Sequence, residues 1–347
     1  MKPIRLAPNQ PPRSFDGGAA IAAFRGLRPL DRRAPEDWIA SATTLYDEPE
    51  QGLTRLPDGR WLRDAMSADP EGYLGPDHAA AWGGDPALLI KLLDAKQRLP
   101  VHVHPNREFA RRHLDCPYGK TEAWVVLAAS GPRPVVHLGF RDDVEAGELA
   151  AQVEAQDTAA ILAAMNEVPV APGDAILVPA GLPHAIGAGV FVLELQEPTD
   201  FSILLEWDGF DFDGPRIGHL GLGFDVALES VDRSGWPEAR LRELSARRPP
   251  RPGSASTVLP LFPAAADPYF RADLIGSATP VPLEPGFSVI TVLAGSGELT
   301  TQWAGDYAVH AGDILLVPYG AGTTTLTGPL EAVRCRPPDP ADAETGR

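Results

Sequence analysis

The apolar residues of this chain fall mainly in short runs bounded by glycine, proline and polar turn residues. Two such runs are 123–128 (AWVVLA) and 135–140 (VVHLGF). Short apolar runs between turn residues are typical of buried β-strands. We therefore expect these two strands to pair with each other through a turn at Gly131. The same pattern predicts further strands over 168–207 and 258–337.

Two segments depart from this pattern. Residues 145–167 are rich in alanine and repeat apolar positions at roughly helical spacing, which predicts a small insert of one or two helices. Residues 87–97 (ALLIKLLDAKQ) predict an amphipathic segment or a strand at the edge of a sheet. Residues 1–85 carry recurrent turn signals without a clear period, so no element is assigned to them.

A pattern in the middle of the chain returns near its C-terminal end. The segment 173–181 (GDAILVPAG) reappears as 312–320 (GDILLVPYG), and each copy follows a similar strand and turn, at 124–131 and 290–297. Two motifs that recur in the same order indicate two similar β-barrels. The second copy has no histidine after Pro318, so we expect the second barrel to be metal-free.

The chain is thus predicted to be mainly β, with two barrels and a small helical insert. We assign residues 1–244 to an N-terminal metal-binding domain with its insert at about 145–167, and residues 258–347 to a degenerate C-terminal domain. The segment 245–257, rich in proline, serine and charge, is the expected linker.

Composition narrows the range of partners. The net charge of −17 over 347 residues argues against binding to nucleic acid or an anionic membrane, which both require basic patches. Two cysteines imply no disulfide framework and favour the cytoplasm. No apolar run approaches the ~20 residues of a membrane span, and the N-terminus lacks the apolar core of a secretion signal. We expect a monomer that acts on a small molecule.

Four side chains offer the ligands of a metal site. His102 and His104 are separated by one residue, so in a strand both would project from the same face. Glu122 precedes a predicted strand, and His184 follows the Gly-Asp turn, strand and Pro-Ala-Gly turn of the first barrel. Three imidazole nitrogens and one carboxylate suit Zn²⁺, Fe²⁺, Mn²⁺ or Ni²⁺.

Other residues compete for this role with less support. Glu108 is an alternative carboxylate, because His-x-His followed by Glu four residues on also occurs in small barrels, but a strand directly follows Glu122. The remaining candidates lie in loops or lack a partner at useful spacing: Cys116, His113, His137 and His219.

The motifs together resemble a known family. They are LLIKLLD at 88–94, VHVHPN at 101–106, GKTEAW at 119–124, PGDAILVPAGLPHA at 172–185, VLELQ at 192–196 and GPRIGH at 214–219. In this order they resemble the type I mannose-6-phosphate isomerases, in particular their short bacterial form. These are bicupin zinc enzymes, so the resemblance implies two cupin barrels of jelly-roll type.

The resemblance also implies a site and a reaction. His104, Glu122 and His184 fall on the zinc ligands of the family, and His102 falls where its members carry glutamine or lysine. Lys120 matches a lysine close to the substrate. The implied activity is the interconversion of mannose 6-phosphate and fructose 6-phosphate through a cis-enediol, with one Zn²⁺ per chain.

One position departs from the family pattern. Leu204 stands where the family has an arginine that orients the substrate, and no other basic residue lies between 190 and 215. Arg216 is the nearest substitute for substrate binding. Two alternatives therefore stay open: an isomerase of a different or unphosphorylated sugar, and a metal-binding cupin without isomerase activity, such as a sugar sensor or an iron-dependent dioxygenase.

Isomerisation also needs groups that move protons and stabilise charge. Glu194, Glu197 and Glu206 are candidate bases on or after the strand that follows His184. We favour Glu206, because it places a charge inside an otherwise apolar run. Lys120 is the second expected catalytic residue, since its ammonium group can polarise an oxygen or bind a phosphate.

Overall fold

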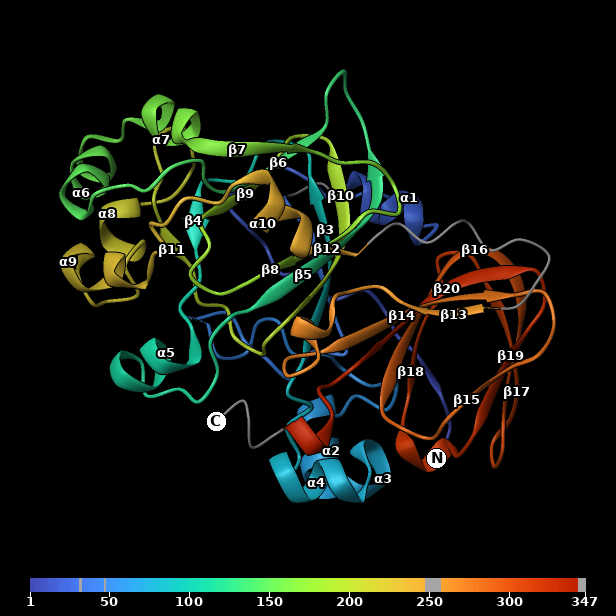
Figure 1. Ribbon diagram of the computed structural model, residues 1–347. Coiled ribbons are helices and arrows are strands. Elements are labelled where there is room, and N and C mark those ends of the chain that lie inside the picture. The colour runs from blue at the N-terminus through green and yellow to red at the C-terminus, as the bar shows by residue number, and fades with distance from the viewer. Residues whose placement is uncertain (31–32, 47, 247–256, 343–347) are drawn as a thin grey trace.

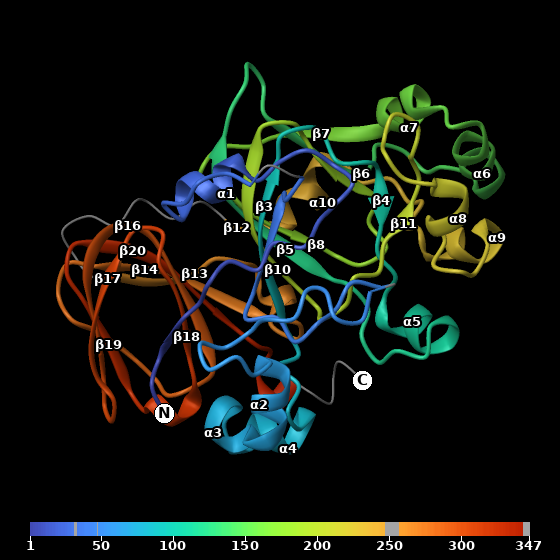
Figure 2. The ribbon, with the colours of Figure 1, turned by 180° about the vertical axis from the view of Figure 1, so that it is seen from behind.

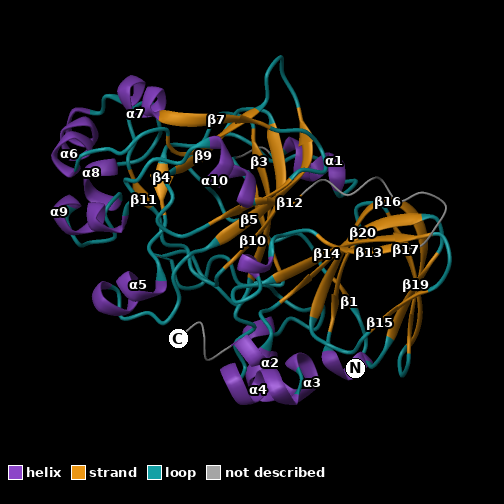
Figure 3. Ribbon diagram, viewed as in Figure 1, coloured by secondary structure: helices purple, strands orange, loops and turns teal. Residues whose placement is uncertain are grey.

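The computed structural model describes residues 1–30, 33–46, 48–246 and 257–342, and it consists of two β-rich bodies with short helices around them (Figures 1 and 3). The predicted mainly β architecture is confirmed, because antiparallel pairing connects the strands of three sheets. Within these residues, no helix has the length and apolar character needed to cross a bilayer.

Two antiparallel sheets form the first barrel. The six-stranded sheet has the order β12 (Ser245–Ala246), β8 (Ala175–Val178), β5 (Glu122–Ala129), β10 (Val190–Gln196), β3 (Leu89–Ala95) and β2 (Glu36–Ile39). The five-stranded sheet has the order β11 (Ile203–Leu204), β4 (His102–Val103), β9 (His184–Ile186), β6 (Val135–Phe140) and β7 (Met165–Pro169). An apolar cluster that includes Trp124, Leu138 and Val192 fills the space between the sheets.

The second barrel is built from nine described strands. They are β1 (Ile4–Arg5), β13 (Thr257–Pro260), β14 (Arg271–Ser277), β15 (Val281–Leu283), β16 (Ser288–Thr301), β17 (Gly305–His310), β18 (Ile314–Val317), β19 (Thr324–Thr327) and β20 (Leu330–Arg336). Short 3₁₀ turns accompany them: η2 (Ala264–Ala266), η3 (Tyr319–Ala321) and η4 (Pro340–Asp342).

The helices lie outside the barrels (Figure 1). They are α1 (Ala19–Phe24), α2 (Leu62–Ala68), α3 (Pro70–Leu74), α4 (Pro76–Trp82), α5 (Arg107–His113), α6 (Ala146–Ala155), α7 (Thr158–Ala164), α8 (Gly214–Ile217), α9 (Phe224–Ala227), η1 (Leu228–Ser230) and α10 (Glu238–Glu243). The predicted insert corresponds to α6 and α7, but it ends at Ala164, because the next residues pair with β6 as β7.

The internal repeat appears as two strand pairs in the same register. In the first barrel β5 pairs with β8, and Trp124 lies opposite Ile176. In the second barrel β16 pairs with β18, and Ile290 lies opposite Leu315. These four positions are equivalent in the two copies of the sequence motif.

Two local predictions were wrong. The runs at 123–128 and 135–140 do not pair with each other, because β5 lies between β8 and β10, while β6 lies in the other sheet. The chain crosses between sheets at this turn. The segment at 87–97 forms β3, which lies between β10 and β2 with every residue buried, so it is an inner strand and not an edge.

The boundary between the barrels is less simple than a single linker. Strand β1 adds to the second barrel by pairing with β18, although it begins the chain (Figure 2). Of the predicted linker, residues 247–256 lie outside the described part of the chain, Ser245 and Ala246 form β12, and Thr257 begins β13. A single apolar cluster contains residues of both barrels, for example Leu193 and Val289.

Candidate metal centre

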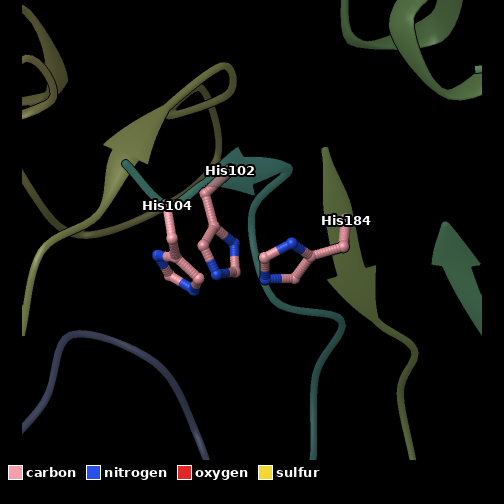
Figure 4. A group of neighbouring side chains, drawn as sticks. All are labelled: His102, His104 and His184. Atoms are coloured by element: carbon pink, nitrogen blue, oxygen red, sulfur yellow. The ribbon is translucent and has the colours of Figure 1, made fainter. Parts of the chain in front are cut away.

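Three histidines converge inside the first barrel. His102 lies in β4 directly opposite His184 in β9, and His104 follows two residues after His102. One ring nitrogen from each lies within 4.8 Å of the others. The three rings are turned toward one another (Figure 4). The expected geometry of the His-x-His pair is therefore present in the structure.

Backbone carbonyls orient the three rings. In His102 the Nδ1 atom lies 2.8 Å from the backbone oxygen of Pro100. In His104 it lies 2.7 Å from the backbone oxygen of Phe201, and in His184 it lies 2.8 Å from that of Leu182. An Nδ1–H that donates to a carbonyl leaves the lone pair on Nε2, which is the usual arrangement of a metal-binding imidazole. The Nε2 atom of His184 is buried and has no hydrogen-bond partner among the described residues.

Glu122 supplies a carboxylate beside these nitrogens. Its Oε2 lies 3.0 Å from Nε2 of His104, and its Oε1 lies 3.4 Å from Nε2 of His184. Trp124 orients the group, since its Nε1–H donates to Oε1 over 2.9 Å. The potential donors are thus three imidazoles and one carboxylate, a set that fits a divalent metal ion.

Charge states in the cluster agree with this reading. Burial, followed by the charge of Lys120, lowers the pKa of His104 to about 3, and burial and His184 lower the pKa of His102 well below its usual range. Burial alone would raise the pKa of Glu122, but Lys120 and His104 lower it well below its usual range. The imidazoles of His102 and His104 are therefore neutral and the carboxylate is ionised at neutral pH, as metal ligands require.

Lys120 lies next to the ligand set, as expected for a residue that acts at this site. Its Nζ is 2.7 Å from Nε2 of His104 and donates to Oε2 of Glu122 over 2.8 Å. The side chain is almost fully buried. Its ammonium group would therefore face any oxygen that approaches the metal ligands from the cavity.

His102, Glu122 and His184 lie on the wall of a cavity of 360 Å³, and Lys91, Glu194 and Arg13 also line it. Lys91 is buried between two carboxylates, with Nζ at 3.6 Å from Glu36 and 3.6 Å from Glu194. Glu194 accepts a hydrogen bond from Trp124 Nε1 over 3.2 Å. Burial, and then the charge of Glu122, raises the pKa of Glu194 to about 7.

Arg13 reaches the cavity from the N-terminal segment. Its Nε donates to Glu36 over 2.9 Å, and its two terminal nitrogens donate to the carboxylate of Asp200 over 3.3 and 3.0 Å. The side chain is 22% exposed, compared with 3% for Lys91 and 6% for Lys120. Arg13 is therefore the most accessible of these three cations.

The other predicted site residues lie in different surroundings. Leu204 lines the cavity directly opposite His102, which places it beside the ligand set as the family pattern implies. Arg216 is 73% exposed beside Asp213 and is absent from the cavity wall formed by the described residues. Its expected contact with substrate has no support in this structure.

Glu206, the favoured base, is buried in an ion pair outside this cavity wall. Arg98 donates to its two oxygens, each over 2.6 Å, and the backbone N–H of Val101 donates to Oε2 over 2.8 Å. Glu197 is similarly held by Arg107 and by the N–H of Thr121. The charge that interrupts the apolar run at Glu206 therefore joins the segment after β11 to the residues that precede β4.

The competing ligands do not join the cluster. Glu108 is exposed and pairs with Arg112 on α5, so Glu122 is the carboxylate that meets the histidines. Within the described residues, the metal-binding group does not include Cys116, His113, His137 or His219.

The interpretation of the sequence missed Arg13, Lys91, Glu36 and Asp200. A signal existed for Lys91, because it places a charge inside the apolar run LLIKLLD, which is the same argument that selected Glu206. Nothing in the N-terminal segment singles out Arg13, since the segment has no periodic pattern.

Comparison with known proteins agrees with this geometry. No family model matches the chain. The mannose-6-phosphate isomerase ManA of Bacillus subtilis is 30% identical over 327 residues, which cover 91% of this chain and 93% of that protein. A mannose-6-phosphate isomerase of Streptococcus mutans is 30% identical over 251 residues, 71% of this chain and 72% of that protein. The crystal structure of a mannose 6-phosphate isomerase from Bacillus subtilis superimposes with a TM-score of 0.72 at 20% identity, covering 97% of this chain and all of that one.

Proposed function

Because this chain belongs to the mannose-6-phosphate isomerase family, we propose that it interconverts mannose 6-phosphate and fructose 6-phosphate in a metal-dependent reaction. The observation that carries this proposal is the convergence of three oriented imidazoles and one carboxylate beside a 360 Å³ cavity, which His102, Glu122 and His184 line. The alternative of a cupin without isomerase activity has no comparable support.

The proposed metal is Zn²⁺, one per chain, held by His102, His104, Glu122 and His184. When bound, it would polarise the carbonyl and hydroxyl oxygens of the sugar. The unpartnered Nε2 of His184 and the fixed tautomers of all three rings support this assignment. Three nitrogens and one oxygen fall within the ligand preference of zinc.

We propose that Glu194, and not Glu206, carries the proton between C1 and C2. Glu194 lines the cavity and has a pKa of about 7, so it can both accept and donate a proton near neutral pH. Lys91 would stabilise its ionised form from 3.6 Å away. Lys120 would donate to the sugar oxygen on which negative charge develops in the enediol.

Arg13 is the cation that we assign to the phosphate in place of Arg216. It is the most exposed cation compared above, and it has five N–H groups, of which three are donated to Glu36 and Asp200. Two donors are left for an incoming anion. The carboxylates fix the guanidinium plane, which suits the geometric recognition of phosphate by arginine.

A second candidate substrate is an unphosphorylated aldose. The observation that favours it is Leu204, which places an apolar side chain opposite His102 where the family has a cation. Arg13 in addition meets two carboxylates, so its charge is already balanced. A neutral sugar would require no surplus positive charge in the cavity.

A turnover assay on protein of known metal content tests both substrates. We expect kcat/KM for mannose 6-phosphate to exceed that for free mannose by at least about tenfold, because a phosphate contact contributes on the order of 1.5–3 kcal/mol. A higher kcat/KM for free mannose would establish the second candidate. Absence of turnover on mannose, its 6-phosphate and related pentoses would refute the isomerase proposal. The proposed setting is a monomer in the cytoplasm.

A further inference from the structure

A second cavity, of 280 Å³, lies at one end of the second barrel. Its wall includes three arginines: Arg271 on β14, and Arg334 and Arg336 on β20. The turn between α3 and α4 and the segment after β20 also border it, so helices from the N-terminal part of the chain meet the second barrel there. Nothing in the proposed isomerase reaction uses this cavity.

The strand registers relate this cavity to the metal centre. Glu194 lies opposite Trp124 on one side and Lys91 on the other. In the second barrel, Ile290 takes the place of Trp124, and Arg334 lies opposite Ile290 on one side and Asp273 on the other. Arg334 is thus the counterpart of Glu194.

The charges at these equivalent positions are reversed. The pair formed by Lys91 and Glu194 becomes the pair of positions Asp273 and Arg334. The next pair in the same direction, Leu89 and Gln196, becomes Arg271 and Arg336. By the same register Ser288 replaces the ligand Glu122. The two carboxylates of the first site, Glu122 and Glu194, are therefore replaced in the second barrel by Ser288 and Arg334.

One of the three guanidinium groups lacks a counter-charge. Arg336 pairs with Asp273 over 2.6 Å, and Arg271 pairs with Asp339 over 2.7 Å. Arg334 is only 7% exposed, forms no ion pair with a described carboxylate and donates one hydrogen bond, to the carbonyl of Glu284 over 2.7 Å. An uncompensated buried charge is strongly destabilising.

Further donors in this region have no partner. The Nε atoms of Arg334 and Arg336 and the hydroxyl of Ser288 are buried without a hydrogen bond among the described residues. Burial, followed by the charge of Arg336, lowers the pKa of Arg334 to about 10, while the charges of Asp273 and Glu284 act in the opposite direction. The exposed side chains of Asp77 and Glu284 also border the cavity, and neither pairs with Arg334.

We propose that this end of the second barrel binds a small phosphate-bearing anion, with Arg334 as its central contact and Arg336 and Arg271 beside it. A phosphate group has several acceptor oxygens and can meet more than one guanidinium fork, so it would supply the missing counter-charge. Free inorganic phosphate and the phosphate of a sugar phosphate share this chemistry.

Calorimetric titration of the full-length protein tests the proposal. Inorganic phosphate, mannose 6-phosphate and acetate are titrated at equal ionic strength into the wild type, Arg334→Met, Arg271→Gln and, as a control, Arg242→Gln, which removes an exposed arginine on α10. We expect Arg334→Met to weaken phosphate binding at least tenfold, Arg271→Gln to weaken it severalfold and the control to leave it unchanged. Binding of mannose 6-phosphate but not of inorganic phosphate at the Arg334-dependent site would identify the sugar ester as the ligand.

Thermal unfolding provides a second readout. Phosphate should raise the unfolding midpoint of the wild type and the control but not that of Arg334→Met. If Arg334→Met fails to fold, Arg271→Gln carries the test, since its partly exposed partner Asp339 can be solvated. The proposal is refuted if the wild type binds neither inorganic phosphate nor mannose 6-phosphate at an Arg334-dependent site, or if the folded arginine variants bind them as the wild type does.

Discussion

Single charged side chains determine what the first cavity can do. Lys91 and Glu194 carry charges within strands that are mostly apolar, and both are buried. Removing a charge from water costs several kcal/mol unless it is paired. Lys91 pairs with both Glu194 and Glu36, and this pairing keeps the charges inside the barrel beside the proposed metal ligands. This ordered polar cluster is the part of the site to which we assign the proton transfer.

Paired substitutions separate the proposed base from the residue that the sequence favoured. Glu194→Gln should lower kcat about 10²–10⁴-fold, the usual contribution of a general base, with metal content unchanged. Glu206→Gln should instead reduce the free energy of unfolding by about 1–3 kcal/mol, because it removes the charge that faces Arg98. Steady-state kinetics and urea unfolding of both variants give the answer. A collapse of kcat in Glu206→Gln with unchanged stability would contradict the assignment.

The raised pKa of Glu194 predicts a pH effect on the stability of metal-free protein. Its pKa is about 7 in the folded state against 4.5 in the unfolded chain, so between these values the folded state binds more protons. The stabilising effect is present in full below pH 4.5 and is lost as the pH rises through 7. The difference in unfolding free energy between the wild type and Glu194→Gln should therefore change across this window. A constant difference from pH 4.5 to 7.5 would rule out the shift.

The clustering of the histidines with Glu122 could be predicted from residue types and spacing, since a strand places His102 and His104 on one face. Arg13 could not be predicted, because its position depends on how the N-terminal segment crosses the barrel. The role of Glu206 could not be decided from the sequence for a related reason. A charge in an apolar run marks a buried partner, and the sequence does not show whether that partner is a substrate or an arginine such as Arg98.

At the scale of elements, the two Gly-Asp turns hold equivalent strand pairs. In the first barrel Gly173 donates to the carbonyl of Val126, and in the second Gly312 donates to that of Val292. The second turn has an additional neighbour, because it packs against the end of α1 at Phe24. The turn therefore connects the N-terminal segment to the second barrel.

Two glycine substitutions measure this contact. Gly312 and Gly305 have similar φ values, 89° and 87°, so alanine should cost about 1–2 kcal/mol of backbone strain at either site. A Cβ at Gly312 would also lie 2.2 Å from the carbonyl oxygen of Phe24, while at Gly305 it would meet nothing within 4 Å. Urea unfolding should show Gly312→Ala to be the more destabilised, by at least about 1 kcal/mol. Equal losses would show that α1 does not pack tightly on this turn.

The kinds of elements could be predicted from the apolar pattern, while their partners could not. The strands at 123–128 and 135–140 were predicted as strands, but each is apolar enough to be buried on two faces. Such a strand fits more than one neighbour, so a turn between two strands does not decide that they pair. The arrangement became clear only when each strand was placed in its sheet.

At the scale of the whole molecule, the N-terminal segment joins the two barrels. Strand β1 adds to the second barrel, and the following residues return to the first, where Asp94 accepts the N–H groups of Gly18 and Ala20 over 2.8 and 2.9 Å. The apolar cluster shared by the barrels buries residues of both. The division at 245–257 that the sequence predicted therefore separates two parts of one packed molecule. The sequence pattern could not reveal that Ile4, near the start of the chain, pairs with β18 on the other side of this division.

The shared core predicts how the molecule unfolds. Val289 belongs to this cluster and is fully buried. Its substitution by alanine should therefore lower the stability of both barrels. Hydrogen exchange measured by mass spectrometry should then show faster exchange in β10 as well as in β16. Faster exchange confined to the second barrel would show that the barrels are energetically independent. Thr301→Ala, at the far end of β16, is the matched control.

The central claim is that the three histidines and Glu122 hold a metal on which isomerisation depends. It is tested most directly by measuring mannose 6-phosphate turnover together with bound metal, in protein stripped by a chelator and then titrated with Zn²⁺, and in His184→Ala. Activity should rise in proportion to bound zinc and level off at one ion per chain, while His184→Ala should lose at least about tenfold in metal affinity and regain little activity. Full turnover by the stripped protein, or by His184→Ala without metal, would contradict the account.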